Sequence, residues 1–244
     1  MNYKAVLQYD GTRYRGWQTQ GNTDNTIQGK LETLLTKMAG EPVEVNGSGR
    51  TDAGVHAAGQ VISFRCKTKE SPEEICRYMN EYLPEDIAVL TVEEAAPRFH
   101  ARLNAVRKTY VYRIWNAPVR NVFRRKFTTW IQKPLDLDAM EQAAALLCGT
   151  NDYRAFCSLK KFKKSTVRTI EKIEIGKMGQ EIRISYTGDG FLYHMVRILT
   201  GTLVEVGLGL RKPEEMTEIL EGQDRTKAGR LMPPEGLTLE SVEY

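Results

Sequence analysis

One acidic side chain stands in an unusually glycine-rich stretch of this chain. Residues 46–60 contain four glycines and join two stretches that are typical of short strands, at residues 43–45 and 61–64. Asp52 is the only acidic residue of the stretch, and Arg50 precedes it by two positions. Small residues let a substrate approach closely, and a loop this long in a compact domain is usually functional or disordered. Asp52 is therefore the first candidate for chemistry.

Several interpretations of Asp52 compete. Its side chain could accept local backbone N–H bonds in an Asx-turn, which is the common role of an Asp among glycines. A metal site would need more ligands than one Asp and one His, and no Asp-x-Asp or His-x-x-His pattern within residues 46–60 supplies them. A phosphate-binding G-x-x-x-x-G-K-[ST] loop is also absent. What remains is a lone carboxylate that acts as nucleophile or base and is kept ionised by a cationic partner.

Two segments of the second half carry further candidates. Tyr110 and Tyr112 alternate along a predicted strand at residues 109–115; at least one should fill the core, and the other could stack on a base. Arg197 interrupts the apolar face of a predicted helix at residues 191–203. An arginine is costly to bury without a partner, so a carboxylate is expected beside it. Asp52, Asp189 and a surface Glu all remain possible.

The three histidines lack the surroundings of a Ser-His-Asp or Cys-His set. We interpret each of them as a hydrogen-bonded structural residue or one that faces RNA: His56, His100 and His194.

The elements that must position these residues follow a repeated order. The first half predicts β-α-β-β-α-β, with Asn25 and Gln28 as a capping-box pair for its first helix and Ser71 and Glu74 for its second. The second half repeats the order with one extra helix, near residues 214–220, and a last strand at residues 237–242. The predicted fold class is α+β, with two ferredoxin-like halves, largely antiparallel sheets and a basic cleft between them. We place the halves at residues 1–102 and 103–244.

The positive charge is segregated along the chain. Residues 95–135 contain ten Lys and Arg and residues 153–170 contain six, and neither block has an Asp or Glu. The formal net charge is +4, so the rest of the chain is net −12. Clustered cations release condensed counterions when they meet phosphates, so this pattern favours a nucleic-acid partner over a merely solvated face.

Other features exclude several classes of protein. No apolar run approaches the roughly 20 residues of a membrane helix, and no signal-peptide segment is visible, so we expect a cytoplasmic protein without membrane contact. The four cysteines have neither C-x-x-C spacing nor a nearby His pair. We expect them to be free thiols, with no zinc site and no disulfide framework: Cys66, Cys76, Cys148 and Cys157.

Motifs spread over the whole chain together resemble the TruA family of tRNA pseudouridine synthases. The most specific is the run Gly49-Arg50-Thr51-Asp52-Ala53-Gly54-Val55-His56. Five others occur in the family's order: Tyr9-Asp10-Gly11 with Gly16-Trp17-Gln18, Thr26-Ile27-Gln28, Lys108-Thr109-Tyr110-Val111-Tyr112-Arg113, Phe191-Leu192-Tyr193-His194-Met195-Val196-Arg197 and Pro233-Pro234-Glu235-Gly236-Leu237-Thr238-Leu239.

The resemblance implies a fold, a reaction and roles for residues. It implies the pseudouridine synthase fold, a homodimer, no cofactor and no metal, and action on uridines 38 to 40 in the anticodon arm of tRNA. It makes Asp52 the catalytic aspartate and Arg197 its partner. Tyr110 becomes the tyrosine that stacks on the base, and Arg50 the arginine that helps to take the nucleotide out of its stack.

The chemistry leaves three routes and two competing functions open. Asp52 could attack C1′ of the ribose, add to C6 of the ring or assist elimination to a glycal. A catalytically silent RNA-binding module on the same scaffold is the second hypothesis, and an Asp-dependent nuclease is the third. The nuclease is disfavoured because metal ligands are missing from the sequence.

Overall fold

The computed structural model describes residues 1–21 and 23–244. The chain divides into two compact units, which we describe separately. Unit 1 contains Met1–Val106 together with Thr238–Tyr244, and unit 2 contains Arg107–Leu237. The predicted boundary between residues 102 and 103 stays a prediction, and the last strand, predicted at residues 237–242, pairs with a strand of unit 1 at Thr238 and Leu239.

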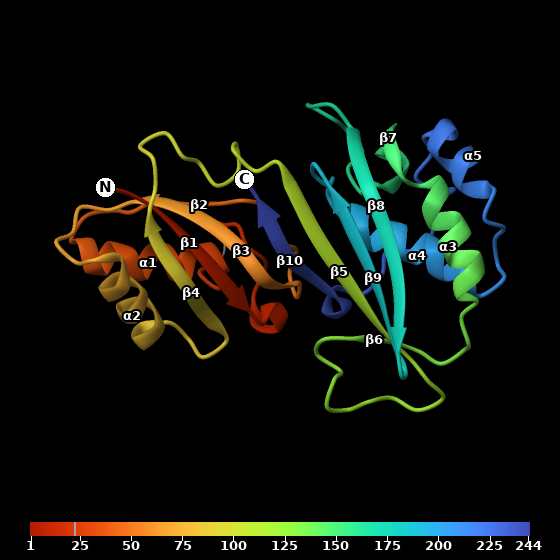
Figure 1. Ribbon diagram of the computed structural model, residues 1–244, viewed down its shortest axis with the longest axis horizontal. Helices are drawn as coiled ribbons and strands as arrows, with labels where there is room; N and C mark the ends of the chain where they lie inside the picture. The colour runs from red at the N-terminus through yellow and green to blue at the C-terminus, as the bar shows by residue number, and fades with distance from the viewer. Residues whose placement is uncertain (22) are drawn as a thin grey trace. The chain divides into compact units, whose positions relative to one another are not determined.

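Unit 1 is an antiparallel sheet with two helices on one face (Figure 1). Its strands run in the order β4-β1-β3-β2, every neighbouring pair is antiparallel, and the last strand, β10, joins β3 in parallel. The element bounds are β1 Asn2–Tyr9, α1 Ile27–Ala39, β2 Val45–Gly47, β3 His56–Arg65, α2 Pro72–Tyr82, β4 Ile87–Glu94 and β10 Leu237–Glu243, with a short 3-10 turn at Gly11–Arg13.

The core of unit 1 follows from alternation along the strands. In β1, every second side chain is buried, which is the period-2 pattern of a strand with one covered face. Leu7 of β1 and Ile62 of β3 are fully buried, as are Leu35 of α1 and Met79 of α2. This buried core anchors β1 and β3, and the glycine-rich loop leads directly into β3.

The helix starts of unit 1 confirm one capping prediction and correct another. The predicted capping box of Ser71 and Glu74 is present in full at the start of α2. For α1, the N-cap is Thr26, whose side chain accepts from the backbone N–H of Gly29. The Asn25–Gln28 capping box is therefore wrong. The Asn25 amide donates instead to the carbonyl of Arg13, 2.6 Å away, and so ties the helix start to the turn after β1.

Unit 2 repeats the two-layer arrangement with a four-stranded antiparallel sheet in the order β5-β9-β8-β7, and β6 adds to β5 in parallel. Helices α3 and α4 pack against each other beside this sheet (Figure 1). The bounds are β5 Arg107–Asn116, β6 Thr129–Ile131, α3 Leu137–Leu146, β7 Gly149–Asp152, β8 Val167–Met178, β9 Glu181–Gly188, α4 Met195–Gly207 and α5 Glu215–Gly222, with 3-10 turns at Arg154–Phe156 and Pro234–Gly236.

Helix α4 begins later than its apolar pattern predicts. The pattern extends from Phe191, but His194 has φ 65°, in the left-handed region, and the helix starts at Met195. A residue in that conformation cannot be part of a right-handed helix. The four residues before α4 instead form a separate segment in which Phe191 packs against Tyr110.

Both units are therefore mixed α+β structures with mostly antiparallel strands. Within the described part of the chain, no helix is long and apolar enough to cross a membrane.

Candidate active site

The glycine-rich loop occupies residues 48–55, between the end of β2 and the start of β3. Asp52 lies in this loop with its side chain half-buried. The backbone carbonyl of Asp52 accepts from the N–H of Val55 at 3.1 Å, which closes a turn directly after the carboxylate. Arg50, two residues earlier, is exposed. The loop thus presents one acidic and one basic side chain from a fixed turn.

Buried hydrogen bonds fix the part of the loop that precedes Asp52 in the sequence. The amide of Gln60 on β3 donates to the carbonyl of Gly49 at 3.0 Å and accepts from the hydroxyl of Ser48 at 2.6 Å. The Gln60 amide also donates to the hydroxyl of Tyr9 at 3.4 Å, and that hydroxyl lies 2.9 Å from the Thr51 hydroxyl. The buried Gln60 amide therefore connects two residues of the loop, Ser48 and Gly49, with Tyr9 of β1, and Tyr9 contacts a third loop residue, Thr51.

Tyr9 stays protonated in this arrangement. Complete burial raises its pKa to about 12, because burial penalises the phenolate more than the hydrogen bonds with Thr51 and Gln60 stabilise it. Since Gln60 already donates to the phenol oxygen, the Tyr9 hydroxyl is available to donate to Thr51, the residue directly before Asp52.

Two glycines of the segment after β1 allow it to pack closely on the loop. Gly16 has φ +94°, and a Cβ there would lie 2.9 Å from the Thr51 carbonyl oxygen. At Gly11 a Cβ would lie 2.0 Å from the Val55 carbonyl oxygen. The N–H of Trp17 donates to Thr51 at 3.0 Å. No larger residue has room at either glycine, so the segment supports the loop on both sides of Asp52.

The histidines have structural surroundings. His56 is buried at the start of β3, and its Nδ1 accepts from the N–H of Gly11 at 3.1 Å and lies 3.3 Å from Asp10. His100 accepts through Nδ1 from the N–H of Arg102, and His194 Nδ1 lies 2.8 Å from the Ser158 hydroxyl. These contacts favour the structural interpretation for all three.

In unit 2, the two tyrosines of β5 have different surroundings. Tyr112 is fully buried; its hydroxyl donates to the carbonyl of Pro233 at 2.7 Å and lies 2.6 Å from the Thr129 hydroxyl. Gly236 packs on its ring, because a Cβ there would lie 2.6 Å from two ring carbons. Tyr110 is also buried, at 8% exposed, so both tyrosines of the pair lie in the core. Tyr110 contacts the edge of Phe191, with ring centroids 5.3 Å apart.

Arg197 has a defined hydrogen-bond partner within unit 2. It is the third residue of α4 and is 8% exposed. Its Nε donates to the backbone carbonyl of Met232 at 2.7 Å, and the N–H of Met232 donates back to the Arg197 carbonyl at 3.3 Å. Sequence analysis missed Met232, because a backbone acceptor can come from any residue type.

The structure thus distributes the predicted residues over two units. Asp52 and Arg50 belong to the loop of unit 1, and Tyr110 and Arg197 belong to β5 and α4 of unit 2.

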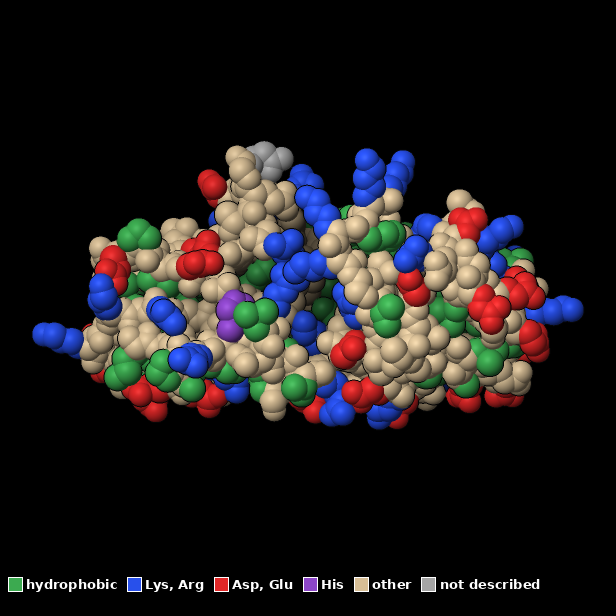
Figure 2. All heavy atoms as spheres, turned by 90° about the horizontal axis from the view of Figure 1, so that it is seen from above, with side chains coloured by type: hydrophobic (Ala, Val, Ile, Leu, Met, Phe, Trp, Pro, Cys, Tyr) green, Lys and Arg blue, Asp and Glu red, His purple; other side chains and the backbone are tan. Residues whose placement is uncertain are grey.

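Lys and Arg side chains gather over part of the face seen in Figure 2. In unit 2, the basic run at residues 160–164 is exposed, and the guanidinium of Arg154 lies 5.9 Å from the ring centroid of Phe162.

Among the described residues, no three His, Cys, Asp or Glu side chains are placed to hold a metal ion. The four cysteines are free thiols, and burial raises the pKa of Cys66 and Cys148.

Comparisons with known proteins agree along the whole chain. A family model described as tRNA pseudouridine synthase matches residues 5–104 and 143–244. A tRNA pseudouridine synthase A of Bacillus sp. (strain KSM-64) is 48% identical over 243 residues, which is 100% of this chain and 99% of that protein. The protein of Brevibacillus brevis with the same name is 46% identical over 99% of this chain and 98% of its own length.

A tRNA pseudouridine synthase A 2 of Bacillus anthracis is 44% identical over 100% of this chain and 99% of that protein. Such identity over almost the full length of each protein leaves no part of the chain unaccounted for. Together with the matching family model, it shows that the chain belongs to the TruA family of tRNA pseudouridine synthases, which are isomerases.

Proposed function

We propose that this chain isomerises uridine to pseudouridine at positions 38 to 40 of the anticodon arm of tRNA, with Asp52 as the catalytic carboxylate. The observation that carries the proposal is the loop of unit 1. Its backbone is fixed by buried hydrogen bonds and close glycine packing around a half-buried carboxylate. Such a loop presents a reactive group without reorganisation at the moment of reaction.

The reaction needs few chemical groups. The C1′–N1 bond breaks, the uracil turns, and C5 bonds to C1′; the proton leaves C5 and a proton is gained at N1. No electrons are exchanged and no net water is consumed, so the chemistry assigns no task to a redox cofactor. One carboxylate suffices, whether it attacks C1′, adds to C6 or assists formation of a glycal.

The other predicted residues take supporting roles in the proposal. Arg197 pairs with Asp52, and the bond from its Nε to the Met232 carbonyl supports this role because it fixes the Arg197 side chain within unit 2. Tyr110 stacks on the extruded base, and Arg50 helps to take the nucleotide out of its stack. Flipping the base costs a few kcal/mol, which stacking and phosphate contacts offset.

At a larger scale, we propose that two ferredoxin-like halves enclose a basic cleft for the anticodon arm, in a homodimer. The strand order β4-β1-β3-β2 of unit 1 supports the ferredoxin-like arrangement, and the acid-free basic blocks support the basic cleft.

Substitution Asp52→Asn tests the proposal because it removes the charge and almost no volume. We expect pseudouridine formation to be abolished while the affinity for tRNA changes by less than about threefold. Tritium release from tRNA labelled at uridine C5 measures the first quantity, and filter binding measures the second. Asp24→Asn, at an exposed position of the same unit, is the matched control and should turn over normally.

Two results would overturn the assignment. Turnover by the Asp52→Asn protein would remove Asp52 from the mechanism. A wild-type protein that binds a minimal anticodon arm but never forms pseudouridine would support the silent RNA-binding module.

A further inference from the structure

Segment 229–232 of unit 2 is bound to helix α4 by four hydrogen bonds. The N–H of Gly229 donates to the Thr202 hydroxyl at 2.9 Å, and the N–H of Arg230 donates to the Glu205 carboxylate at 3.1 Å. Met232 completes the set with its two backbone bonds to Arg197. Side chains of α4 thus hold the segment at one end, and the segment holds Arg197 at the other.

Close packing of segment 229–232 against the backbone of α4 allows the segment only one position on the helix. A Cβ at Gly201 would lie 1.9 Å from the Arg230 carbonyl oxygen, and a Cβ at Gly229 would lie 2.6 Å from the backbone nitrogen of Thr202. The backbone of the segment therefore rests directly on the backbone of α4. A shift of the segment would carry the Met232 carbonyl, and with it the Arg197 side chain.

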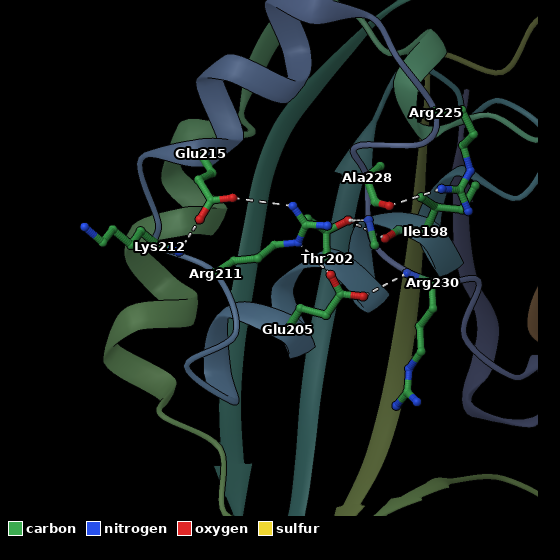
Figure 3. A network of polar contacts seen from close by, with 10 residues as sticks. Ile198, Thr202, Glu205, Arg211, Lys212, Glu215, Arg225, Ala228 and Arg230 are labelled. Atoms are coloured by element: carbon green, nitrogen blue, oxygen red, sulfur yellow. Dashed lines mark hydrogen bonds and ion pairs between the residues drawn. The ribbon is translucent and has the colours of Figure 1, made fainter.

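Glu205 is in turn held by an ion pair. Its second carboxylate oxygen lies 2.6 Å from Nε of Arg211, and both side chains are about four-fifths buried. Figure 3 shows Glu205 between the Arg211 guanidinium and the backbone of Arg230, whose own side chain extends away from the network. Glu215 contacts Arg211 from the other side, at 3.5 Å. The carboxylate of Glu205 is thereby fixed in the orientation that the Arg230 N–H requires.

We propose that Glu205 is a positioning residue for the reaction: together with Arg211 it fixes segment 229–232 on α4 and so holds the guanidinium of Arg197 in place. This inference rests on the role of Arg197 in the proposed function. Glu205 itself touches neither the substrate nor the reacting atoms. It acts through one backbone segment, whose Met232 carbonyl accepts the Arg197 Nε–H.

The test compares Glu205→Ala with Glu205→Gln in the full-length protein, with a tRNA substrate. The alanine variant loses the acceptor for the Arg230 N–H, whereas the glutamine variant keeps an acceptor oxygen. We expect kcat to fall about tenfold or more in Glu205→Ala, with KM for tRNA within about twofold, because a small displacement of a catalytic group is costly. Glu205→Gln should recover most of the lost kcat.

Urea unfolding separates positioning from a general loss of folded protein. A positioning role lowers kcat in protein that is fully folded under the assay conditions, whereas unfolding lowers the apparent kcat only in proportion to the folded fraction. Glu218→Ala, which removes an exposed glutamate of α5, is the matched control and should leave both kcat and the folded fraction unchanged.

If Glu205→Ala does not fold, Thr202→Val tests the same segment at its other anchor and should reproduce the fall in kcat. Wild-type kcat in whichever of the two variants is assayed, or a fall in kcat that only matches the loss of folded protein, would overturn the inference. The Asp52→Asn protein distinguishes failure of the proposed function from failure of the positioning role. If Asp52→Asn is inactive and Glu205→Ala is unaffected, only the positioning role of Glu205 fails. If Asp52→Asn remains active, the proposed function fails first.

Discussion

Glu181 is a carboxylate that is 2% exposed and is held by two arginines of unit 2. Arg183 Nε lies 2.6 Å from one oxygen, and Arg124 contacts the other. Burial alone would raise the pKa of this carboxyl, but the hydrogen bond and charge of Arg183, followed by the charge of Arg124, outweigh it and hold the pKa below 4.5. A carboxyl whose pKa is lower in the folded than in the unfolded protein stabilises the folded protein at pH values above its unfolded pKa. That stabilisation is lost as the pH falls through the folded pKa.

We therefore expect Glu181→Gln to lower the free energy of unfolding at pH 7 by about 1–2 kcal/mol, since the arginines are half-exposed and partly solvated. The difference from wild type should shrink as the pH falls below about 4.5. Urea unfolding at several pH values measures it. Glu174→Gln removes an exposed ion pair with Lys172 and should cost less than about 0.5 kcal/mol. A difference that grows toward low pH would contradict the linkage.

Single residues also mark how far the sequence predicts the candidate site. Glycine content, loop length and a lone acid pointed to Asp52, because those properties are visible in the residue types. The Gln60 amide that fixes the loop and the Met232 carbonyl that holds Arg197 left no such signal. Both act through backbone contacts that depend on how strands and segments pack.

At the scale of elements, the segment between β1 and α1 serves as a support for the loop. Gly16→Ala should lower kcat by about tenfold or more, because φ is +94° and the new Cβ would press on the Thr51 carbonyl, next to Asp52. The free energy of unfolding should fall by about 1–2 kcal/mol as well. Steady-state kinetics and urea unfolding measure the two effects.

Gly40→Ala provides the matched control for that prediction. Gly40 has φ +70° at the end of α1, and a Cβ there would meet nothing within 4 Å. The backbone strain is similar, so stability should fall by about 1 kcal/mol while kcat stays unchanged. Equal losses of activity in the two variants would show that strain alone, and not displacement of the loop, is responsible.

Elements were predictable where one local signal dominated. The capping box of Ser71 and Glu74, followed by Pro72, defines the start of α2. The start of α4 was not predictable, because His194 adopts a left-handed backbone that tertiary packing imposes on an apolar helical pattern. At α1, Asn25 and Thr26 are both good caps, and only the contact of Asn25 with the Arg13 carbonyl decides between them.

At the scale of the whole molecule, the homodimer stays a prediction from family resemblance. Light scattering of the purified protein should give a mass of about twice 27.7 kDa, since most homo-oligomers are closed and symmetric. A mass of 27.7 kDa over the micromolar range would contradict it.

The pairing of β10 with β3 has a consequence for how the protein is made. Thr238 and Leu239 lie opposite His56 and Ala57, at the strand end that adjoins the Asp52 loop, and Gly59 leaves room for the Glu240 carbonyl. A ribosome delivers β3 early and β10 only after all of unit 2 has been synthesised. Unit 1 therefore stays unfinished during translation, and a chain interrupted before residue 238 would carry Asp52 beside an uncovered strand edge. The sheet that carries the Asp52 loop is therefore completed only after residues 107–237 have been synthesised.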